Sequence, residues 1–92
     1  MGKEIRLFKS EDRWNRSEVS RFLHQMADKI ADGEVTLRQG KEELTLTMPF
    51  NLILEVQVED EDKKRKGIQH SLEIEIKWFD SDEAGGPLEL VP

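Results

Sequence analysis

The sequence predicts an α+β domain with the element order β-α-β-β-β-β, in which one amphipathic helix packs on one face of a mostly antiparallel sheet. A capping signature followed by apolar residues at spacings of three and four is typical of a single surface helix. After the helix, four segments alternate between apolar and polar residues, as strands do when one face of a sheet is buried. The apolar stripe of the helix and the apolar face of the strands must both be buried, and packing one against the other buries both.

The length and composition of the chain point to one small domain. With 92 residues there is room for a single hydrophobic core. We assign residues 1–79 to this domain and residues 80–92 to an acidic, mobile C-terminal tail. The chain is 36% hydrophobic and 37% charged, and its apolar residues are patterned rather than scattered. This patterning favours a folded domain over disorder.

The charge and the missing residue types exclude several classes of function. A net charge of −6 disfavours binding to nucleic-acid phosphates and to anionic membranes. The chain has no cysteine, which excludes disulfides, thiolate metal sites and cysteine nucleophiles. No apolar run approaches the roughly 20 residues of a membrane span, and the N-terminus lacks the apolar core of a signal peptide. We therefore expect a cytoplasmic protein that binds neither nucleic acid nor membrane.

The first predicted element is a strand over residues 4–10. Ile5 and Leu7 alternate with polar residues and would share one face of the strand. Beside the strand that follows the helix this segment would run parallel, whereas beside the last strand it would run antiparallel. We favour the last strand because antiparallel pairs are commoner, but the pattern leaves both placements open.

A helix over residues 16–31 is the most clearly marked element. Asn15 is a suitable N-cap, and Glu18 three residues later completes a capping box. Trp14 precedes the cap, where it can pack on the first turn. Gly33 stands where a left-handed C-terminal cap is expected. The apolar stripe of the helix consists of Val19, Phe22, Leu23, Met26 and Ile30.

Four strands are predicted after the helix, in a run typical of a meander. The first two are residues 34–38 and 43–48. The last two are residues 51–60 and 70–79, with a long charged loop over residues 61–67 between them. The core-facing phase of these two strands consists of Leu52, Leu54, Val56, Val58, His70, Leu72, Ile74, Ile76 and Trp78.

Taken together, the capped helix and the last strand resemble the amphi-Trp domain proteins, a family of small uncharacterised bacterial and archaeal proteins. The resemblance runs from about residue 4 to residue 78. It rests on the segments NRSEV (15–19), ADKIADGEVTL (27–37) and SLEIEIKW (71–78). The resemblance implies that Trp78 is the tryptophan that names the family. It supports the domain boundary and implies no activity.

Trp78 and His70 are the residues best placed to contact a small ligand at the rim of the sheet. Trp78 falls in phase with the core residues of its strand, so a buried indole is favoured, and ligand stacking is the alternative. His70 lies in the same phase at one end of the strand and is interpreted as a rim residue. A small-molecule-binding or enzymatic site near these two residues is the rival to an interaction role.

His24 and Asp28 stand four residues apart on the predicted helix, a spacing that can bring a histidine and a carboxylate together for general-base chemistry. Both lie opposite the apolar stripe with no nucleophile beside them, so a solvated pair is favoured. His24 and His70 are too far apart in the sequence to suggest a metal site. We expect no catalytic residue, no metal and no cofactor.

Two charged regions of the predicted sheet are interpreted as solvent-exposed surface rather than as binding sites. The outward face of the last two strands is rich in carboxylates, but a flat face lacks the loop that wraps a cation, so a solvated face is favoured. The basic residues 63–66 directly follow the acidic residues 59–62, and a charged hairpin loop is favoured over a recognition patch. The outward face carries Glu55, Gln57, Glu59, Glu73, Glu75 and Lys77.

Three apolar residues fall in the outward phase of their strands and form a candidate interaction patch. These are Phe8, Ile53 and Phe79, and the last two would lie near the same end of a hairpin. The alternative is that Leu88 or Leu90 from the tail covers them. We expect a non-enzymatic protein-interaction module that binds an unknown protein, or a second copy of itself, through this patch or an open sheet edge.

Overall fold

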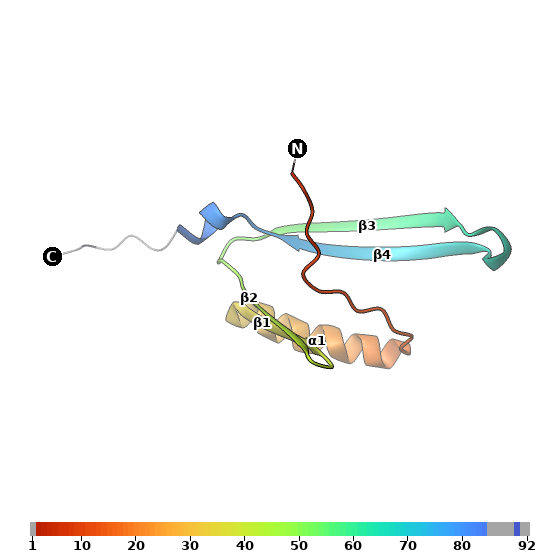
Figure 1. Ribbon diagram of the computed structural model, residues 1–92, viewed down its shortest axis with the longest axis horizontal. Helices are drawn as coiled ribbons and strands as arrows, with labels where there is room; N and C mark the ends of the chain where they lie inside the picture. The colour runs from red at the N-terminus through yellow and green to blue at the C-terminus, as the bar shows by residue number, and fades with distance from the viewer. Residues whose placement is uncertain (1, 85–89, 91–92) are drawn as a thin grey trace. The chain divides into compact units, whose positions relative to one another are not determined.

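The computed structural model describes residues 2–84 and residue 90 of the chain. It shows an α+β protein with one helix, α1, and four strands, β1 to β4, all paired antiparallel (Figure 1). Two short 3₁₀ helices, η1 and η2, follow β3 and β4. The chain divides into two units, residues 1–48 and residues 49–92, and each is described in turn.

The first unit is organised around α1 (Arg16–Asp32), whose N-terminus is capped as predicted. The backbone N–H of Glu18 donates to Asn15 Oδ1 at 2.8 Å, and the backbone N–H of Asn15 donates to Glu18 Oε1 at 3.2 Å. This reciprocal pair satisfies two amide groups that have no partner inside the helix. At the other end Gly33 takes a left-handed conformation (φ 87°), and its N–H donates to the carbonyls of Lys29 and Ile30.

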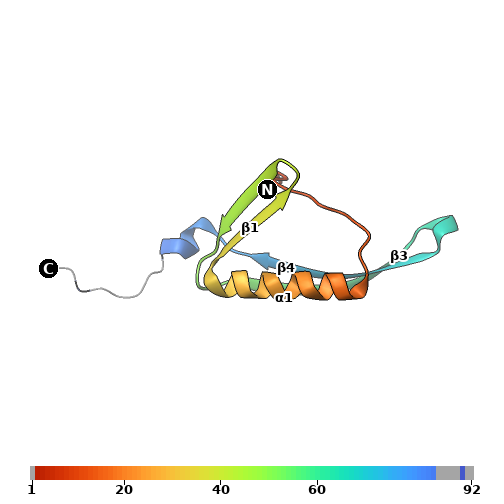
Figure 2. The ribbon, with the colours of Figure 1, turned by 90° about the horizontal axis from the view of Figure 1, so that it is seen from below.

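Gly33 turns the chain from α1 directly into the hairpin of β1 (Glu34–Gln39) and β2 (Glu42–Thr47), which Figure 2 shows leaving the C-terminal end of the helix. The strands pair in register, and the Thr36 and Thr45 hydroxyl oxygens lie 2.9 Å apart across them. The helix contacts β1. The core of this unit is small: Val35 is only 4% exposed and Met48 is also buried.

The second unit is a long hairpin of β3 (Ile53–Asp62) and β4 (Ile68–Lys77), with η1 (Lys64–Lys66) in its turn. All ten residues of each strand are paired, from Ile53 opposite Lys77 to Asp62 opposite Ile68. The four strands thus lie close to their predicted positions.

The single predicted sheet is instead two two-stranded sheets, β1–β2 and β3–β4. Between Thr47 and Ile53 the structure has no strand, and Pro49 lies in this connection. Because proline lacks the backbone N–H that a sheet ladder requires, it ends β2 and separates the two pairs in sequence. Alternation predicted the strands correctly but could not show which strands pair.

The predicted strand over residues 4–10 is not formed, since residues 2–15 carry no regular secondary structure. Ile5 and Leu7, which were to supply its buried face, are both exposed. Phe8, the residue that breaks the alternation, is the half-buried one. Alternation shows which residues would share a face if a strand formed, but a strand forms only where a neighbouring strand supplies the hydrogen bonds of its ladder.

The segment after β4 begins with η2 (Asp80–Ala84). The backbone N–H of Phe79 donates to Asp82 Oδ2 at 2.8 Å, and the N–H of Asp82 donates to the Phe79 carbonyl at 2.9 Å. The start of the predicted mobile tail is therefore a regular turn. Leu90 is fully exposed, and the rest of the tail lies outside the described residues.

Candidate functional site

The β3–β4 hairpin presents an apolar face along most of its length. Three cross-strand pairs form it, because residues two apart in a strand share a face and the register sets each opposite an apolar partner. This surface, the hairpin apolar face, consists of Leu54–Ile76, Val56–Ile74 and Val58–Leu72.

The hairpin apolar face is exposed, although its residues were predicted to form the core. Val58 is 72% exposed and Leu72 is 68% exposed, and only Ile76 among the six is half-buried. A two-stranded hairpin on its own is marginally stable in water, because half of its apolar surface has no cover. Exposed aliphatic residues in three successive pairs form one contiguous apolar patch rather than scattered surface residues.

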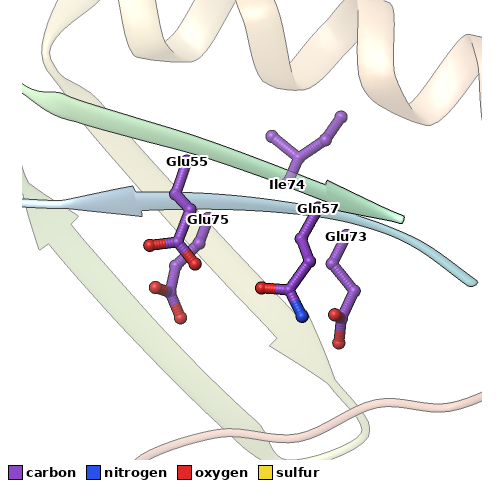
Figure 3. Close-up of a pocket in the computed structure, with 5 residues that line it drawn as sticks. All are labelled: Glu55, Gln57, Glu73, Ile74 and Glu75. Atoms are coloured by element: carbon purple, nitrogen blue, oxygen red, sulfur yellow. The ribbon is translucent and has the colours of Figure 1, made fainter. Parts of the chain in front are cut away.

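The opposite face of the hairpin is acidic. Figure 3 shows Glu55, Gln57, Glu73 and Glu75 on one side of the strands and Ile74 on the other. These residues line a shallow hollow of about 470 Å³. Glu55 stands directly opposite Glu75, a like-charged pair that opposes strand pairing unless a cation relieves it.

Lys77 supplies that cation. Its Nζ lies 3.0 Å from Glu55 Oε1 and 3.5 Å from Glu75 Oε1. The hydrogen bond and the charge of Glu55, with a smaller effect of Glu75, raise the pKa of Lys77 above its ordinary value of 10.5. Lys77 therefore stays charged and joins the two carboxylates at the base of the hairpin.

At the tip of the hairpin, charged side chains contact neighbouring residues of the same turn. Asp62 Oδ1 accepts the backbone N–H of Lys64 at 2.8 Å, and Lys63 Nζ lies 3.2 Å from Glu61 Oε1. Lys64 adopts a left-handed conformation (φ 61°) at the turn. These contacts support the interpretation of residues 63–66 as a charged hairpin turn.

The structure does not bring Trp78 and His70 together. His70 lies near the tip, where its Nδ1 is 2.6 Å from Asp60 Oδ1, and both side chains are exposed. Trp78 is half-buried and follows the last residue of β4, at the other end of the strand. Eight residues of extended chain separate the two residues by about 27 Å, so they cannot contact one small ligand within one chain.

The residues of the predicted interaction patch fall in different units. Phe8 belongs to the first unit, while Ile53 and Phe79 belong to the second. Ile53 is 46% exposed and stands opposite Lys77 on the acidic face, and Phe79 is 65% exposed just beyond β4. Leu90 does not cover them, since it is itself fully exposed, and Leu88 lies outside the described residues.

Phe8 lines a groove in the first unit, together with the start of α1 and the strand β1. The Trp14 and Phe22 rings form its aromatic part and meet edge to face, with their centroids 5.6 Å apart. The groove has a volume of about 690 Å³. Alternation did not reveal it, because Phe8 and Trp14 lie in an irregular segment, although Trp14 was expected to pack on the first turn of the helix. Its lining includes Phe8, Trp14, Val19, Phe22, Leu37 and Arg38.

The other residues considered for catalysis or metal binding do not form a site in the described part of the chain. Neither a hydrogen bond nor an ion pair joins His24 to Asp28 in the described part of the chain, and both residues are exposed. Among residues 2–84 and 90, no group of three or more histidine, aspartate or glutamate side chains is arranged to hold a metal ion. Within the same residues, no helix is both long and apolar enough to cross a membrane.

Comparison with known proteins places the chain in a family without assigning an activity. The family model of the Amphi-Trp domain matches residues 1–90, and so covers both units. A search of curated proteins and a search of solved structures found no match. Because the family model spans almost the whole chain, the protein belongs to the Amphi-Trp domain family.

Proposed function

We propose that the chain is a small, non-enzymatic protein-interaction module whose binding surface is the hairpin apolar face. The observation that carries the proposal is the exposure of three successive aliphatic pairs along β3 and β4. Covering them removes apolar surface from water, which is the main favourable term in most protein association. The acidic opposite face disfavours binding there, since its carboxylates would lose water without gaining partners. A cytoplasmic location belongs to the same proposal and is supported by the absence of cysteine.

The rival, a small-molecule site beside Trp78 and His70, has less support. His70 lies in β4 near the tip of the hairpin, whereas Trp78 follows the other end of the strand, and the hydrogen-bonding partner of His70 is Asp60 on the neighbouring strand. A catalytic histidine needs a substrate-sized site around it, whereas the His70 side chain is exposed at the tip of a hairpin.

The proposal predicts that one charge on the apolar face abolishes partner binding. Val56→Asp places a carboxylate at the centre of the face, and Gln57→Asp adds the same charge one residue away on the acidic face. Tagged full-length wild type and variants are incubated with native-host extract, and bound proteins, including the untagged chain itself, are quantified by mass spectrometry. Binding should persist with Gln57→Asp and fall at least about 30-fold with Val56→Asp, as for a central hot spot.

A third variant, Phe79→Ser, separates this surface from the patch that the sequence predicts. Loss of binding in Phe79→Ser with full binding in Val56→Asp would move the site to the Ile53 and Phe79 end of the hairpin. If wild type retains no protein that Val56→Asp loses, and Phe79→Ser behaves like wild type, the interaction function is wrong. Circular dichroism of each variant shows whether it has kept its fold.

A further inference from the structure

We draw no further inference here: the strongest candidate, the groove of the first unit that Phe8 lines with the start of α1 and the strand β1, carries nothing because no observation in the structure shows what covers or fills it.

Discussion

Single side chains of the β3–β4 hairpin keep its two faces different. Lys77 holds Glu55 and Glu75 at the base of the acidic face through contacts of 3.0 and 3.5 Å. Without that cation the directly opposed carboxylates would repel each other across the strands. On the other face, Val56 and Ile74 meet as an aliphatic pair. Alternation of this kind makes one face of the hairpin charged and the other apolar.

The raised pKa of Lys77 predicts how the hairpin responds to alkaline conditions. Because the folded-state pKa lies above 10.5, the ammonium contributes stability that is complete below 10.5 and is lost as pH rises through the raised value. Lys77→Met, which keeps the aliphatic stem, should lose less stability than wild type across this window. Urea unfolding followed by circular dichroism between about pH 9.5 and 11.5 measures the difference.

Lys41→Met provides the control for this titration. Lys41 lies in the β1–β2 turn and makes no ion pair with the described residues. The alkaline loss of stability in this variant should match that of wild type. If Lys77→Met follows wild type as closely as Lys41→Met does, the ion pairs of Lys77 do not contribute to stability.

At the scale of elements, α1 is positioned by its two ends. The capping box of Asn15 and Glu18 begins it, and the left-handed Gly33 ends it and leads directly into β1. The Met48 N–H donates to the Gly33 carbonyl at 2.8 Å, so the same glycine also joins the end of the β1–β2 hairpin to the helix. Gly33 thus determines how the helix and the first hairpin meet.

Gly33→Ala should destabilise the first unit through its backbone. At φ 87° a Cβ is strained in the left-handed region, although it would meet only the Met48 carbonyl oxygen, at an ordinary 3.6 Å. The expected loss is about 1–2 kcal/mol. Gly33→Asn is the matched control and should lose less, because asparagine tolerates this conformation. Urea unfolding of both variants measures the loss, and an alanine variant as stable as wild type would contradict the role of the glycine.

At the scale of the whole molecule, the two units contain little buried apolar surface of their own. Only Val35 and Met48 are buried hydrophobic residues in the described part of the chain. The stability of a 92-residue protein therefore depends strongly on what covers its exposed apolar residues. A bound protein that covers the hairpin apolar face would provide such a cover, and if that protein is a second copy of the chain, stability also depends on protein concentration.

Thermal unfolding tests whether the covering protein is a second copy, since only then does it depend on the concentration of the chain. If the folded state is a dimer, each tenfold increase in concentration should raise the unfolding midpoint by about 3–5 °C. Differential scanning calorimetry over two decades of concentration measures the shift. Val56→Asp should show a midpoint independent of concentration, and Gln57→Asp should behave like wild type. A constant midpoint for wild type would contradict a dimeric folded state.

The sequence by itself determined the local structure of this protein. The capping box at Asn15, the left-handed Gly33 and the alternation along β3 and β4 depend on residues close in the chain, whose spacing sets backbone geometry and the face of each side chain. The resemblance to the amphi-Trp domain proteins rests on the same segments, and the family model confirms it over residues 1–90. The sequence therefore predicted which residues make up the hairpin apolar face.

Only the tertiary structure decided which of these faces are buried. Periodicity cannot distinguish a face covered by the same chain from one left exposed, because both have the same alternation. Strand pairing is also a long-range choice: Pro49 separates β2 from β3, and residues 4–10 form no strand although Ile5 and Leu7 alternate. Val56 and its neighbours on the hairpin apolar face, which were predicted as core residues, are for this reason exposed in the structure.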